Sequence, residues 1–145
     1  MAIEIYGNVA SGLGKGALFT ELDWAKKQFT EKLGIVPFPG TLNLHLSDDN
    51  EKSKWKSAKT KIPHTVKTTD ENGCDANCYP VFINDQYLGA IVVPQIDNYP
   101  DDRIEIISPL PLREKLSLKN NDRLKLSFNH QHKASTIIFD LDGTL

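Results

Sequence analysis

Short apolar segments, separated by turn-forming residues, dominate this chain of 145 residues. Alternating or continuous apolar runs of about four to eight residues that end at Gly, Pro, Asn or Asp are typical of β-strands. The pattern predicts strands at residues 3–9, 17–20, 42–46, 62–69, 78–83, 87–93, 103–107 and 123–128. The best helical segment is Asp23 to Leu33, whose apolar residues recur every three or four positions before Gly34. Many short strands with one good helix favour a mainly β (α+β) fold, a small barrel with an α-helical insertion.

Two other segments have weaker helical patterns, and one polar stretch marks a boundary. Residues 47–61 are rich in Ser, Lys and Asp and predict a solvated loop or a short helix, and residues 112–116 predict a helical turn. The polar stretch 129–135 separates this first unit from a new apolar strand that begins at Thr136. We therefore expect one barrel domain over residues 1–128, a linker over 129–135 and the truncated start of a second domain over 136–145.

Charge and hydropathy argue against several classes of partner. The net charge of -2 provides no basic field that would attract a polyphosphate backbone, so no nucleic acid is expected. No apolar run approaches the roughly 20 residues that cross a bilayer, and the first residues lack a leader pattern, so we expect a cytoplasmic protein without a membrane partner. Cys74 and Cys78 are too few for a disulfide framework and poorly placed for zinc, which indicates ordinary reduced thiols.

A glycine-rich stretch, Ser11 to Gly16, is the first candidate for chemistry. Alternate glycines allow a sharp turn that directs backbone N–H groups into a concavity suited to phosphate, and Lys15 could add a positive charge. The spacing matches neither the P-loop nor the dinucleotide-binding fingerprint. A flexible hairpin is the alternative interpretation.

Two later stretches present polar residues on predicted strands. Strand alternation places the Thr41 hydroxyl and the Asn43 carboxamide on one side, where both could bind a magnesium ion carried by a nucleotide, although solvent-facing polar residues would have the same pattern. Glu105 lies on the predicted strand 103–107, and the proline-stiffened segment that follows ends at Arg113, which could bind phosphate or ribose. The alternative interpretation is that Glu105 and Arg113 form a surface ion pair or are separately solvated charges.

These stretches, together with residues 89–94, resemble in order and spacing the CTP-dependent riboflavin kinases typical of archaea. The resemblance covers about residues 3–128, and its most specific parts are the Ser-Gly-Leu-Gly-x-Gly loop, Pro39 to Asn43, and Glu105 to Glu114. It implies a six-stranded cradle-loop β-barrel with one α-helix and short helical turns. It also implies an enzyme that transfers the γ-phosphoryl group of CTP to riboflavin, with magnesium, and yields FMN and CDP.

The resemblance assigns roles to individual residues. The nucleotide would be bound by Gly12, Leu13, Gly14, Lys15, Gly16, Ala17, Leu110, Pro111, Leu112 and Arg113. Thr41 and Asn43 would coordinate magnesium, and Glu105 and Asp97 would lie at the flavin. Lys15 stands where the family has Glu, and Asp97 stands where it has Thr, so Asp97 would bring a like charge towards the flavin phosphate. Glu105 and Asp97 are both candidates for the general base, and the sequence does not choose between them.

The last residues, 137–145, resemble the first motif of haloacid dehalogenase-type phosphatases. In that family the residue matching Asp140 is the nucleophile and the one matching Asp142 is an acid/base. The other residues that such a phosphatase requires are missing, so we expect this segment to be inactive. We also expect a parent polypeptide in which a kinase and a phosphatase are fused. Two alternatives to the kinase remain: a non-catalytic flavin or nucleotide sensor built on the same barrel, and, less favoured, a phosphatase.

Overall fold

The computed structural model describes residues 3–12, 14–61 and 63–128. The expected linker at 129–135 and the phosphatase-like segment at 136–145 lie outside these described residues. Within the described ranges, no helix has both the length and the apolar character needed to cross a bilayer.

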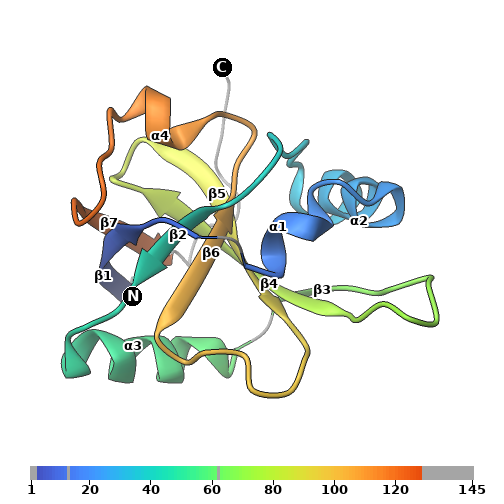
Figure 1. Cartoon of the computed structure of the whole chain (residues 1–145), viewed down its shortest axis with the longest axis horizontal. Coiled ribbons are helices and arrows are strands. Elements are labelled where there is room, and N and C mark those ends of the chain that lie inside the picture. The colour runs from blue at the N-terminus through green and yellow to red at the C-terminus, as the bar shows by residue number, and fades with distance from the viewer. Residues whose placement is uncertain (1–2, 13, 62, 129–145) are drawn as a thin grey trace.

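A closed barrel of antiparallel strands forms the centre of the molecule (Figure 1). The strands are β1 (Ile3–Ala10), β2 (Leu42–His45), β3 (His64–Val66), β4 (Ala76–Ile83), β5 (Tyr87–Pro94), β6 (Arg103–Ile107) and β7 (Arg123–Phe128). Their order is β4-β5-β6-β2-β1-β7, and β7 pairs again with β4, so six strands close the barrel. The short strand β3 extends the sheet at β4, as part of an arm that projects from the barrel in Figure 1. The predicted mainly β, six-stranded barrel is confirmed.

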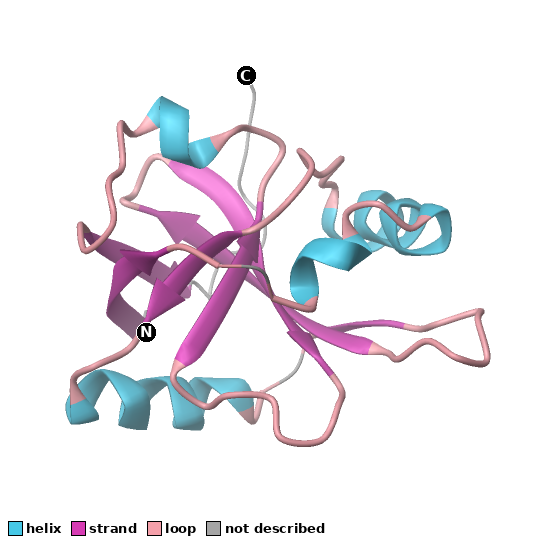
Figure 2. Ribbon diagram, viewed as in Figure 1, coloured by secondary structure: helices cyan, strands magenta, loops and turns pink. Residues whose placement is uncertain are grey.

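The helices lie at the outside of this barrel (Figure 2). They are α1 (Gly16–Phe19), α2 (Asp23–Gln28), the π-helical turn η1 (Phe29–Leu33), α3 (Asp49–Lys59) and α4 (Leu112–Lys115). The helix predicted over residues 23–33 is confirmed as α2 with η1, and Gly34 ends it in the left-handed region at φ 69°. Residues 47–61, for which the pattern allows a solvated loop or a short helix, contain α3. Its first turn is capped by the Asp48 side chain, which accepts a hydrogen bond from the Asn50 amide.

The prediction of a strand at residues 17–20 is wrong, because Ala17 to Phe19 belong to α1 and Thr20 caps its C-terminal end. The Thr20 amide and hydroxyl both donate to the Ala17 carbonyl, which closes a helical turn. The short apolar run still has one buried member, Phe19, while the neighbouring Leu18 is exposed. A run of four residues is too short for its apolar pattern to distinguish a strand from one turn of helix.

Two apolar clusters explain why some strands have no polar face. One fills the barrel and includes Ile104 and Ile106 of β6, and the other lies between the outside of the barrel and α1–η1 and includes Ile107. Strands β5 and β6 are therefore buried on both faces, which accounts for their nearly continuous apolar sequence. Since side chains alternate along a strand, Glu105 points out of the barrel, towards the side that α1 covers.

Gly89→Ala tests how closely β5 and β6 approach. A Cβ atom at Gly89 would lie 2.7 Å from the Ile107 carbonyl oxygen and 2.8 Å from Ile83 Cδ1, so β5 would have to shift. Overpacking of this kind costs about 1–3 kcal/mol, and we expect that loss in the free energy of unfolding measured by urea titration. Leu88→Ala, at an exposed position of the same strand, is the control and should change the value by less than about 0.5 kcal/mol. Equal values for the two variants would contradict the packing described.

Candidate functional site

The glycine-rich loop closes directly over the Glu105 carboxylate. The Gly16 amide donates to both carboxylate oxygens, at 3.1 Å to Oε1 and 3.2 Å to Oε2. A Cβ atom at Gly14 would lie 2.1 Å from Oε1, and one at Gly16 would lie 3.0 Å from the same atom. The loop therefore needs glycine at these positions so that its backbone can reach the carboxylate. This close contact joins the end of the glycine-rich stretch to β6.

Glu105 is completely buried, at 0% exposure, and its partners are neutral donors. Besides the Gly16 amide, the Tyr99 hydroxyl donates to Oε2 and the Thr41 hydroxyl lies 3.4 Å from Oε1. Within the described ranges, no Lys, Arg or His forms an ion pair with it. The alternative of a surface ion pair or a solvated charge is thus wrong for Glu105.

The Tyr99 phenol keeps its proton in this environment. Burial, the hydrogen bond to Glu105 and the negative charge of that carboxylate all raise the pKa of Tyr99 above its usual value of about 10. Tyr99 therefore acts as a hydrogen-bond donor throughout the physiological pH range.

Thr41 and Asn43 lie side by side, as strand alternation predicts. The Thr41 hydroxyl donates to Asn43 Oδ1 at 2.9 Å, and Asn43 Nδ2 donates to the Gly12 carbonyl at 2.7 Å. In the barrel register, Asn43 is paired with Glu105 on one side and with Ala10 on the other. Asn43 is 8% exposed, so it is not the solvent-facing residue of the alternative interpretation. Strand β2 thus connects the glycine loop to Glu105.

Arg113 faces the same hollow as the loop and the Thr41–Asn43 pair. A cavity of about 280 Å³ is lined by Ala10, Ser11, Gly12, Thr41, Leu42, Asn43, Arg113 and Asn120. Arg113 Nη2 donates to Asn120 Oδ1 at 2.7 Å, and Asn120 Nδ2 donates to the Ser11 hydroxyl at 3.2 Å. Asn120 therefore bridges two segments that the sequence proposes for phosphate binding. The sequence indicates Asn120 only as a turn residue, and no local signal marks it as part of a site.

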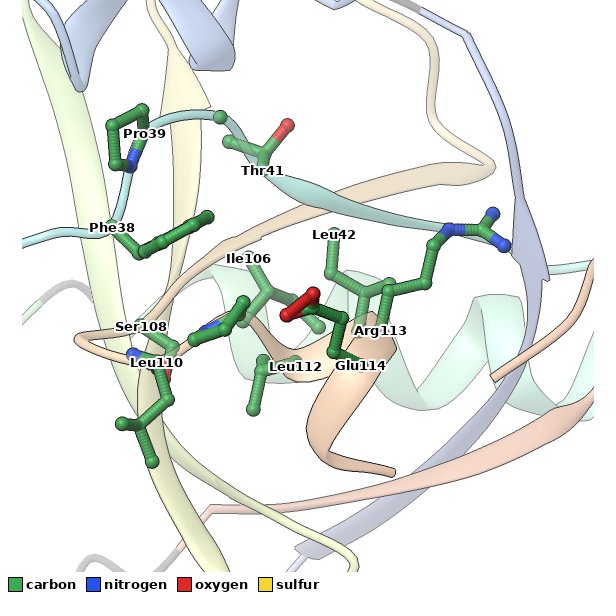
Figure 3. Close-up of a pocket in the computed structure, with 12 residues that line it drawn as sticks. Phe38, Pro39, Thr41, Leu42, Ile106, Ser108, Leu110, Leu112, Arg113 and Glu114 are labelled. Carbon is green, nitrogen blue, oxygen red and sulfur yellow. Dashed lines mark hydrogen bonds between the residues drawn. The ribbon is translucent and has the colours of Figure 1, made fainter. Parts of the chain in front are cut away.

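A second, more apolar cavity of about 290 Å³ adjoins the first (Figure 3). Its lining includes the side chains of Phe38, Pro39, Ile106, Leu110, Pro111 and Leu112. Both cavities share Thr41, Leu42 and Arg113, so they form one continuous surface. In Figure 3 the Arg113 side chain extends away from the apolar group around Phe38 and Leu110. The site thus combines an apolar half suited to a flat ring with a polar half suited to phosphate.

The remaining predicted residues are placed less centrally. Lys15 is exposed just before α1, and Ala17 is half-buried within α1. Asp97 is exposed between β5 and β6 and lines a different cavity, together with Lys59 and Tyr99. Leu13 lies outside the described residues. The structure therefore brings together Gly12, Thr41, Asn43 and Arg113, but not Lys15 or Asp97.

The Thr41–Asn43 pair could supply two ligands to a magnesium ion whose other ligands belong to a bound nucleotide or to water. The two side-chain oxygens are 2.9 Å apart. Adjacent ligands of an octahedral Mg²⁺ at roughly 2.1 Å would be about 3.0 Å apart, so the spacing suits two neighbouring coordination positions. Among the described residues, no group of three or more His, Cys, Asp or Glu side chains could hold a metal. A metal at Thr41 and Asn43 would therefore take its remaining ligands from phosphate and water.

Comparisons with known proteins identify relatives over most of the chain. The family model CTP-dep_RFKase, described as Domain of unknown function DUF120, matches residues 9–128. A riboflavin kinase of Methanococcoides burtonii is 42% identical over 128 residues, which cover 86% of this chain and 56% of the relative. One of Saccharolobus solfataricus is 38% identical over 129 residues, covering 86% of this chain and 73% of the relative. One of Methanosarcina mazei is 38% identical, covering 89% and 58%. The chain thus spans little more than half of the length of several of these relatives.

Proposed function

Because this chain belongs to the family of CTP-dependent riboflavin kinases, we propose that it transfers the γ-phosphoryl group of CTP to riboflavin. The 5′-hydroxyl oxygen of the ribityl chain attacks the γ-phosphorus, the bond from that phosphorus to the β–γ bridging oxygen breaks, and FMN and CDP are formed with release of the hydroxyl proton. The observation that carries this proposal is the shared hollow of the glycine loop, the Thr41–Asn43 pair and Arg113. Phosphoryl transfer depends mainly on positioning and charge neutralisation, which these groups supply.

We assign the donor to the two adjoining cavities. Ser11 and Gly12 at the start of the glycine loop line one cavity, and Leu110 to Arg113 line the other. We propose that the segments Gly12 to Ala17 and Leu110 to Arg113 bind CTP, with its charge balanced by the Arg113 guanidinium. Thr41 and Asn43 would hold Mg²⁺, which when bound neutralises triphosphate charge and orients the transferred group. The neutral oxygen pair supports Mg²⁺ as the proposed cofactor, and the triphosphate would supply remaining ligands.

The acceptor side has two candidate carboxylates, Glu105 and Asp97. Glu105 is covered by the glycine loop, so a contact between Glu105 and riboflavin requires the Gly16 amide to release the carboxylate. Asp97 is exposed and lies at a separate cavity. Both remain candidates for the base that accepts the hydroxyl proton, and Glu105 could accept it only after the loop has moved.

Direct assay tests this function. The full chain, Mg²⁺ and riboflavin are incubated with CTP or with ATP, and the products are separated by chromatography. We expect FMN with CTP, much less with ATP, and none after Mg²⁺ is removed with EDTA. If neither donor yields FMN while riboflavin or CTP binds tightly, the protein is a sensor and the kinase proposal is wrong.

A further inference from the structure

We propose that Tyr99 is a positioning residue of the kinase site, one that sets the shape of the glycine loop by holding the Glu105 carboxylate against it. The expected effect of Tyr99 on catalysis rests on the proposed function. Its effect on the position of the loop does not. Neither the sequence motifs nor the resemblance assigns a role to Tyr99, because it lies in the connection between β5 and β6 and outside every motif.

The contacts around the carboxylate single out Tyr99. The Thr41 hydroxyl has one proton, and it is closer to Asn43 Oδ1, at 2.9 Å, than to Glu105 Oε1, at 3.4 Å. Among the described side chains, the Tyr99 phenol is therefore the main donor to the carboxylate. The other donor is the backbone amide of Gly16, which belongs to the loop itself.

The bond from Tyr99 determines where the carboxylate lies. Glu105 is fully buried, so an oxygen that loses its partner is not solvated by bulk water and the group has to turn or to admit a water molecule. Gly14 and Gly16 approach the carboxylate so closely that a turn of the group displaces the loop. Tyr99 thus fixes Glu105, and Glu105 fixes the amide of Gly16, at the end of the loop whose Gly12 lines the cavity of the proposed donor.

This arrangement also connects two parts of the site that are distant along the chain. Tyr99 lines the cavity that includes Asp97, whereas Gly16 follows the loop that borders the CTP cavity. The chain of contacts from Tyr99 through Glu105 to Gly16 therefore joins the connection after β5 to the donor loop.

Tyr99→Phe removes only the phenol oxygen and leaves the ring in place. We expect the Gly16 amide of the ligand-free protein to exchange its hydrogen about tenfold faster, as for the loss of one hydrogen bond to a charged group. We also expect the KM for CTP to rise about tenfold, with a smaller change in kcat, since the loop is less well ordered before the donor binds. In a Glu105→Ala background, Tyr99→Phe should have no further effect on either quantity, because Tyr99 acts through that carboxylate.

Tyr79→Phe is the matched control for exchange and stability. Tyr79 is buried, whereas Tyr99 is partly buried, and the Tyr79 hydroxyl donates to the Lys59 carbonyl at 2.8 Å, away from the loop. The Tyr79→Phe substitution should lower the unfolding midpoint about as much as Tyr99→Phe and leave the hydrogen exchange of the Gly16 amide unchanged. If Gly16 exchange is the same in Tyr99→Phe and the wild type, the proposal is wrong, and the same holds if Tyr99→Phe and Glu105→Ala have additive effects.

The exchange measurement separates this proposal from the kinase proposal. It uses the protein without ligands, so it decides the positioning role of Tyr99 even where Glu105→Ala does not fold or the wild type forms no FMN. If Gly16 exchanges faster in Tyr99→Phe but the wild type forms no FMN, the positioning role of Tyr99 is supported and the kinase proposal is wrong. Normal exchange with full kinase activity in Tyr99→Phe would refute the positioning role alone.

Discussion

Asn43→Ala is expected to lower the rate of FMN formation by about 100- to 1,000-fold while the barrel remains folded. Asn43 would lose both the oxygen that we assign to Mg²⁺ and the amide that donates to the Gly12 carbonyl at 2.7 Å. The first loss removes charge compensation in the transition state, and the second releases the start of the glycine loop. Stability should fall by only about 1 kcal/mol, as for one hydrogen bond. The measurements are FMN produced per unit time and the urea midpoint.

Asn8→Ala is the control for this variant. Asn8 lies on β1 and likewise donates its side-chain amide to a backbone carbonyl, that of Asn121, at 3.2 Å. It does not line the cavity that contains Thr41 and Arg113. We expect Asn8→Ala to keep FMN formation within about threefold of the wild type, a change of well under 1 kcal/mol. Near-normal activity of Asn43→Ala would refute the assignment of the metal to this pair.

Gly14→Ala is the second change for which we expect a large effect. The added Cβ would lie 2.1 Å from Glu105 Oε1 and 2.4 Å from its Cδ, so the carboxylate and the loop cannot both keep their positions. Because Glu105 is buried and already bonded to Tyr99 and Gly16, its displacement breaks those contacts as well. A misplacement of about 1 Å in a site that acts by positioning costs roughly 100-fold in kcat/KM. Overpacking should also lower the free energy of unfolding by about 1–3 kcal/mol.

A steric change elsewhere provides the comparison for Gly14→Ala. A Cβ atom at Gly73 would lie 2.5 Å from the Thr68 hydroxyl, again a clash with the end of a side chain, but in an exposed turn of the arm that carries β3. Gly73→Ala should therefore leave kcat/KM close to the wild-type value. If Gly14→Ala is as active as Gly73→Ala, the close approach of the loop to Glu105 has no role in catalysis.

The strands were the most predictable part of the fold. Arg103–Ile107 and Arg123–Phe128 coincide with the predicted ranges, since each is a short segment in which apolar residues alternate with polar ones or follow one another, next to turn-forming residues. Among the described residues 63–69, the only strand is the three-residue His64–Val66, which pairs with β4 alone at the end of the sheet. The helix α3 was ambiguous for another reason: few of its residues are apolar, with Trp55 and Ala58 buried, and its pattern is that of a polar loop.

The motifs of the candidate site were predictable from the sequence, but the contacts between distant segments were not. Thr41 and Asn43 share a side because strand alternation requires it, and their adjacency is confirmed. The burial of Glu105 could not be read from the strand, since a single charged residue among isoleucines resembles an exposed position. It follows from the covering of β6 by the glycine loop and α1, segments about 90 residues earlier.

Local patterns in this chain therefore specify where strands begin and end, which residues share a strand face, and which glycines allow the backbone to turn. These properties depend on interactions between neighbours in the sequence. The partners of Glu105, Tyr99 and Asn120 were decided only when the barrel closed, because closure sets which distant segments lie beside one another. A buried carboxylate is stable only where donors surround it, and here those donors come from Thr41 just before β2, the glycine loop and the connection after β5.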